Sequence, residues 1–140
     1  MFTRLFLFVL LFASPFAVGA EPRKPTDPPA RSIAVDGANR QFPTTKASQP
    51  TVITNEKELA AAFPDKETQA RLAKEVDFTK EKLLFFAWAG SGQDQLTAAA
   101  EKVGGEIIFN HKMGRTRDLR SHYRLFAIEK DAKWKVVGAF

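Results

Sequence analysis

One segment of the chain is apolar on both of its alternating faces. Residues 83–89 read LLFFAWA and contain no polar side chain. In a strand, successive side chains point to opposite faces, so one face would carry Leu83, Phe85, Ala87 and Ala89, and the other Leu84, Phe86 and Trp88. The pattern predicts a central strand that is covered on both sides, with helices as one of the covers.

Two short helices are predicted ahead of this strand. Asn55 followed by Glu58 resembles a capping box, and Pro64 ends the apolar helical face that follows it: Leu59, Ala60 and Phe63. Asp65 is placed to cap a second helix, whose apolar stripe is Leu72, Ala73 and Val76.

Further strands are predicted on either side of this region. The short β-branched runs RSIAV (31–35) and TVIT (51–54) indicate edge strands. HYRLFAIEK (122–130) and WKVVGAF (134–140) indicate two more strands, joined at residues 131–133.

Residues 96–113 predict a β-hairpin, because Gly104 and Gly105 can adopt the positive φ angles of a two-residue turn. The expected pairing places large residues opposite small ones: Ala100 opposite Phe109, Ala98 opposite His111, and Leu96 opposite Met113. A helix over residues 96–103 is the alternative, since the alanines favour it. With the hairpin, the fold class is α+β and mainly β, an antiparallel meander sheet with one or two short helices packed on one face.

The N-terminus has the pattern of a secretory signal peptide. Residues 1–20 contain a basic start, the apolar run LFLFVLLF and small residues before Ala20, where we expect cleavage. An uncleaved anchor is the alternative. Residues 21–30 carry four prolines and predict a flexible spacer, followed by one globular domain at 31–140. The chain is therefore expected to be exported, to a periplasmic or extracellular location, with no transmembrane segment after cleavage.

Composition narrows the possible functions. The chain has no cysteine, which excludes disulfides, zinc thiolates and a catalytic thiol. Loss of Arg4 with the signal reduces the 21 lysines and arginines to 20, against 16 acidic residues, so the mature formal charge is +4. This mild excess, with Tyr123 as the one aromatic residue of the basic segment 111–124, argues against a specific nucleic-acid binder.

The meander brings two polar connections to one end of the sheet. GSGQDQ follows strand 83–89, and GRTRDLRS follows the second strand of the hairpin. Alternate connections of a meander lie at the same end, so we expect one polar rim that includes Thr116, with His111 and His122 near the adjoining strand ends. Its candidate binding residues are Ser91, Gln93, Asp94, Arg115, Arg117, Asp118, Arg120 and His122.

Three interpretations of this rim are open. In a structural interpretation, Asp94 and Asp118 pair with arginines and the glycines let the loops lie close. In a binding interpretation, the arginines hold an anionic partner, either a protein surface or an anionic envelope polymer. In a catalytic interpretation, Ser91 acts with His111 or His122, or the histidines and aspartates bind a metal ion; neither hypothesis has a recognised motif spacing.

The order of these segments resembles the C-terminal domain of the protease-complex subunit PrcB. The likeness rests on Glu56, Glu58 and Leu59, on Asp77 and Phe78, and on Gly90 to Gly92, and spans about 60 of the 140 residues. The chain departs from that family at GSGQDQL, where a glycine-glycine-aromatic step is usual, and in its arginine loop. The resemblance implies a non-catalytic, exported β-rich domain that contacts proteins, such as a protease.

The sequence therefore predicts a small exported binding or accessory domain that is not an enzyme and uses no cofactor or metal. Its expected partner is an envelope or extracellular protein. An anionic polymer and, last, a hydrolase activity are the alternatives.

Overall fold

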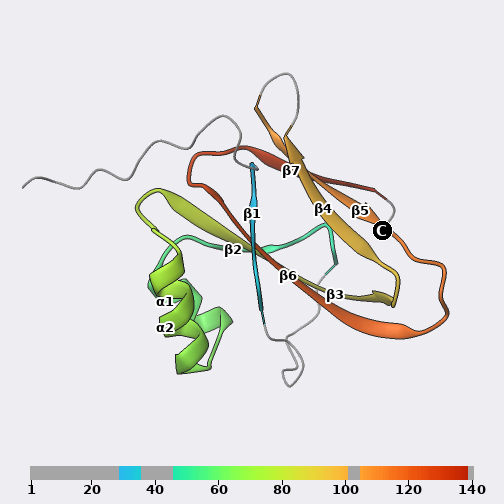
Figure 1. The fold of residues 1–140 in the computed structure, drawn as a ribbon, viewed down its shortest axis with the longest axis horizontal. Helices are drawn as coiled ribbons and strands as arrows, with labels where there is room; N and C mark the ends of the chain where they lie inside the picture. The colour runs from blue at the N-terminus through green and yellow to red at the C-terminus, as the bar shows by residue number, and fades with distance from the viewer. Residues whose placement is uncertain (1–28, 36–45, 101–104, 139–140) are drawn as a thin grey trace, which may run out of the picture.

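Two β-sheets and two helices make up the computed structural model, which describes residues 29–35, 46–100 and 105–138 (Figure 1). The first sheet has the strand order β1-β6-β3-β2, with bounds β1 Arg31–Ile33, β6 Leu119–Glu129, β3 Glu81–Ser91 and β2 Thr51–Ile53. The second has the order β4-β5-β7, with bounds β4 Gln95–Ala100, β5 Ile107–Lys112 and β7 Trp134–Gly138. The helices are α1 Glu56–Ala62 and α2 Lys66–Glu75. The predicted signal peptide and most of the spacer lie outside the described residues.

β3 lies inside the first sheet with both of its faces covered, as its apolar pattern predicts. Leu83, Phe85 and Ala87 pack into a core with the two helices. The alternate residues pack against the second sheet: Leu84, Phe86 and Trp88. The first sheet is thus a middle layer between the helices and the second sheet, and the α+β, mainly β class is confirmed (Figure 1).

Both helices begin at the residues that the sequence indicates. The Asn55 side chain accepts a hydrogen bond from the Glu58 N–H at 2.9 Å, and Glu58 in turn accepts one from the Thr54 N–H at 2.7 Å. The Asp65 carboxylate accepts one from the Thr68 N–H at 2.8 Å. The hydrogen bonds from the Glu58 and Thr68 N–H groups satisfy donors that a helix start leaves without intrahelical partners.

The strand order differs from a simple meander. β3 pairs with β6 rather than with β4, and β7 runs parallel to β5 in the second sheet. The reason is that β6, like β3, is buried on both faces between Leu125 and Ile128. Two such strands are best placed side by side in the middle layer. The hairpin, which has one polar face, forms the outer sheet instead.

The hairpin itself is present, with a register two residues from the predicted one. Residues 95–100 form a strand rather than a helix, and Ala98 lies opposite Phe109, with Leu96 opposite His111. A shift of two residues keeps every side chain on its face, so His111 is still buried. Gly105 has a φ of +67°, whereas Gly104 and the rest of the predicted turn lie outside the described residues.

β1 and β2 occupy the two edges of the first sheet, as their short runs predict. No helix among the described residues is long and apolar enough to cross a membrane.

Candidate functional site

The two predicted polar connections meet at one end of the molecule. We call this surface the rim and define it as the turn Ser91–Asp94 with the loop Met113–Arg120. In Figure 1 the loop is the orange segment between β5 and β6, beside the end of β3. β4 leads away from this end and β5 leads back to it. Both connections therefore lie at the same end, even though β3 and β6 belong to one sheet and β4 and β5 to the other.

Asp94 is the buried anchor of the rim, with its side chain only 3% exposed. One carboxylate oxygen accepts a hydrogen bond from the Gly114 N–H at 2.7 Å, which ties the loop to the turn. The other accepts one from the Trp88 indole N–H at 3.1 Å and lies 3.7 Å from His111 Nε2. The structural interpretation predicted an arginine as the partner of Asp94. That prediction is wrong, because the turn directs the carboxylate inward.

The environment of Asp94 favours its ionised form. Burial acts to raise its pKa, but the hydrogen bonds from Gly114 and Trp88 and the nearby histidines outweigh it, so the pKa lies below the ordinary value. Gly90 makes room for this arrangement: a side chain there would collide with the Asp94 carboxylate.

A chain of hydroxyl and carboxylate contacts fixes the outer part of the rim. Ser91 Oγ lies 2.6 Å from Thr116 Oγ1 and also accepts a hydrogen bond from the Thr116 N–H at 3.1 Å. The Thr116 hydroxyl hydrogen bonds to the Asp118 carboxylate. A hydroxyl has one proton, so Thr116 donates to Asp118 and accepts from Ser91.

Asp118 joins the loop to the turn a second time. It accepts hydrogen bonds from the Gly92 N–H at 3.1 Å and from Arg120 Nε at 2.5 Å. The hydrogen bond from Thr116, followed by that from Gly92, lowers the pKa of Asp118 to about 2. For Asp118, the predicted pairing with an arginine is therefore present.

The two histidines beside the rim both lie against the Trp88 indole. His122 Nε2 lies 2.7 Å from the Ser91 carbonyl oxygen, not from its hydroxyl, and the ring stacks on Trp88. His111 contacts the edge of the same indole. Within the described part of the chain, no group of three His, Cys, Asp or Glu side chains is placed to hold a metal ion.

Four predicted site residues are exposed on the rim: Gln93, Arg115, Arg117 and Arg120, of which Arg120 pairs with Asp118. Arg115 and Arg117 are exposed, and neither has a hydrogen bond or ion pair among the described residues. Gln93 is also exposed, and its backbone N–H lies 3.4 Å from Ser91 Oγ. The contacts of Asp94, Ser91 and Asp118 thus hold a loop whose arginine charges point to solvent.

Two exposed apolar residues of the same loop do not appear among the predicted site residues. Met113 is 52% exposed and Leu119 is 81% exposed. Among the described residues, Val52 is the one other large apolar residue that is exposed. Leu119 lies in the predicted polar connection GRTRDLRS, whose charged residues determined the choice of candidate site residues, and in the structure it begins β6.

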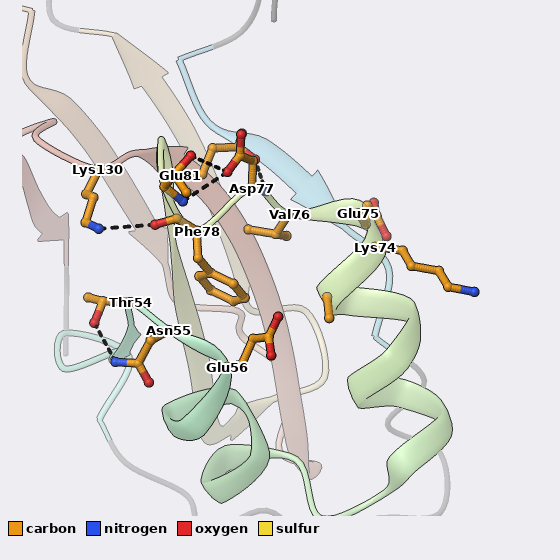
Figure 2. A pocket seen from close by; sticks show the side chains of 12 residues that line it. Thr54, Asn55, Glu56, Lys74, Glu75, Val76, Asp77, Phe78, Glu81 and Lys130 are labelled. Atoms are coloured by element: carbon orange, nitrogen blue, oxygen red, sulfur yellow. Dashed lines mark hydrogen bonds between the residues drawn. The ribbon is translucent and has the colours of Figure 1, made fainter. Parts of the chain in front are cut away.

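Two pockets lie near charged groups. One, of about 330 Å³, lies beside Trp88 and Asp94 and is bordered by Lys46, Ser91 and Met113. The other, of about 920 Å³, lies between the helices and the start of β3, and we call it the helix-side pocket; Figure 2 shows Phe78 among its lining residues.

Three of the four acidic residues that line the helix-side pocket have a basic partner just outside its lining. Arg31 Nη1 lies 3.2 Å from Glu75 Oε1, and Arg31 Nη2 lies 3.2 Å from Glu81 Oε2. Lys80 Nζ lies 4.0 Å from Asp77 Oδ2. Figure 2 also shows Lys130 donating to the Phe78 carbonyl oxygen.

Comparisons with protein-family models, with curated proteins and with solved structures found no significant match. The resemblance to PrcB therefore stays a prediction.

Proposed function

We propose that this protein is an exported, non-catalytic binding module whose rim contacts an acidic surface of a partner protein. The observation that carries the proposal is the composition of the exposed loop. Arg115 and Arg117 have no acidic partner among the described residues, and they lie between Met113 and Leu119, which expose apolar surface.

This composition fits a protein partner. Arginine and methionine are enriched in protein interfaces, where a desolvated apolar centre is surrounded by polar contacts. The guanidinium group binds carboxylates in a planar, bidentate manner, which suits aspartates and glutamates of a partner. The contacts of Asp94 and Asp118 hold the loop in place, which reduces the ordering cost of binding.

An anionic polymer is the second candidate, because the segment 112–124 carries five lysines and arginines and one acidic residue. Polymer binding would depend on the charge alone and would weaken steeply with salt. A protein contact would also depend on Leu119.

The test begins with affinity capture from an envelope extract, followed by measurement of affinity for the captured protein after purification. We expect Leu119→Ala to weaken binding about tenfold, and Arg115→Ala with Arg117→Ala to weaken it by at least as much. The matched control, Lys57→Ala with Lys66→Ala, removes the same charge from exposed helix positions and should bind normally.

Two results would overturn the proposal. One is equal binding by the rim variants and the helix control. The other is binding that responds to the arginines and to salt but not to Leu119, which would favour the polymer.

A further inference from the structure

β4 has one edge with no strand beside it in the described structure. It pairs with β5 on one side, and no other described strand pairs with it. An edge strand presents backbone N–H and C=O groups that can pair with an additional chain.

β4 differs from the other edge strands in lacking any protection. β1 and β2 have three residues each, and β7 carries Lys135 and ends at Gly138. β4 has six residues, Gln95 to Ala100, with no charge and no proline. Charges, prolines and short length are the usual means by which proteins block pairing at an edge.

The side chains of β4 also suit an added strand. Leu96 is buried and Ala98 packs against the second core cluster, whereas Thr97 and Ala99 are exposed on the opposite face. An incoming strand with alternating apolar side chains would extend the core next to Ala98.

The rim adjoins the start of this strand. Gln95 lies opposite Lys112, directly before the loop that exposes Arg115 and Arg117. A chain lying along β4 would therefore bring one of its ends to the positive surface.

We propose that the partner binds by adding an extended segment to β4, with alternating apolar residues along the strand and acidic residues at the rim end. This inference rests on the proposed function and names the form of the partner. A second copy of the protein is the competing occupant of this edge, and sedimentation experiments distinguish it from a separate partner.

The probe is a synthetic peptide of six alternating valines and threonines with three glutamates at one end. It is made in two versions, one with the glutamates at the N-terminus and one with them at the C-terminus. Two further versions carry N-methyl groups on either the odd or the even backbone nitrogens. Alternate N–H groups of a strand point toward the same neighbour, so strand addition predicts that one methylation pattern weakens binding about tenfold and the other has little effect.

Protein NMR locates the binding. Amide shifts should concentrate in Gln95–Ala100 rather than in β1, β2 or β7. Equal effects of the two methylation patterns, shifts at another edge, or no binding at millimolar peptide would overturn the inference. So would a stable dimer that forms through β4 in sedimentation experiments.

The variant with Arg115→Ala and Arg117→Ala separates this inference from the proposed function. If both hold, the variant loses the preference for peptides with glutamates but keeps the dependence on methylation pattern. If the wild type has no preference for glutamates yet keeps that dependence, the acidic-partner proposal fails and strand addition stands.

Discussion

The helix-side pocket and the rim are both polar, but they hold their charges differently. Beside the helix-side pocket, Arg31 bridges the lining residues Glu75 and Glu81, and Arg71 Nη1 also lies 3.4 Å from Glu75 Oε2. At the rim, Arg115 and Arg117 have no such partner among the described residues. The paired acids Glu75 and Glu81 are therefore less available to a charged ligand than the two arginines of the rim are.

The difference shows how one end of the fold can be both rigid and available for binding. The acids of the rim use their hydrogen bonds to join the turn to the loop, through Gly114 for Asp94 and Gly92 for Asp118. The Asp94 and Asp118 carboxylates therefore do not pair with Arg115 and Arg117. At the helix-side pocket, Glu75, Asp77 and Glu81 instead pair with Arg31 and Lys80.

The largest expected effect comes from breaking the buried anchor of the rim. Asp94→Ala leaves the Gly114 and Trp88 N–H groups without their acceptor, and we expect it to lower the free energy of unfolding by about 3 kcal/mol. In thermal unfolding this corresponds to a fall in Tm of roughly 15 °C.

Asp94→Asn is the matched control, because it keeps the shape and one acceptor oxygen, so its loss should be smaller. If Asp94→Ala unfolds at the wild-type temperature, the carboxylate does not anchor the loop, and the rigid rim has no support.

A smaller effect compares one arginine from each region. Arg31→Ala removes hydrogen bonds to Glu75 and Glu81 and should lower the free energy of unfolding by about 1 kcal/mol. Arg115→Ala removes no hydrogen bond or ion pair with the described residues and should change the free energy of unfolding by less than about 0.5 kcal/mol. Urea unfolding of the two variants measures both changes in the free energy of unfolding. Equal losses would show that the charges of the two regions are not held differently.

The smallest effect concerns acid stability. The pKa of Asp118 is lowered from its ordinary value of 3.8 to about 2, so its ionised form stabilises the folded state. That contribution is present above pH 4 and is lost as the pH falls toward 2. The free energy of unfolding should therefore fall more steeply between pH 4 and 2 in the wild type than in Asp118→Asn. Parallel curves for the two proteins would contradict the role of Asp118 in joining the loops.

Several features of the fold could be predicted because they depend on local chemistry. The caps at Asn55 and Asp65 involve residues three positions apart, so spacing alone identifies them. The burial of β3 on two faces follows from its uninterrupted apolar run. The strand order could not be predicted in the same way, because local patterns do not choose which of several apolar strands lies beside β3.

The rim likewise combines features that the sequence predicts with features that it does not. Its location follows from the connectivity of the hairpin, and the excess of arginine is visible in the sequence itself. The partner of Asp94 was not visible, since the Gly114 N–H is 20 residues away and the Trp88 indole lies across the turn. The exposure of Leu119 was also not predictable, because this apolar residue begins a strand whose later residues are buried.

Periodicity and close neighbours specify the mainly β class, the helix starts, the two-sided burial of β3 and the meeting of two polar loops, so these features follow from the sequence alone. The pairing of β3 with β6, the parallel placement of β7 and the division of the rim into anchoring acids and exposed arginines emerge with the tertiary structure. Those outcomes depend on which distant surfaces bury one another, and that competition is settled by packing of the whole domain.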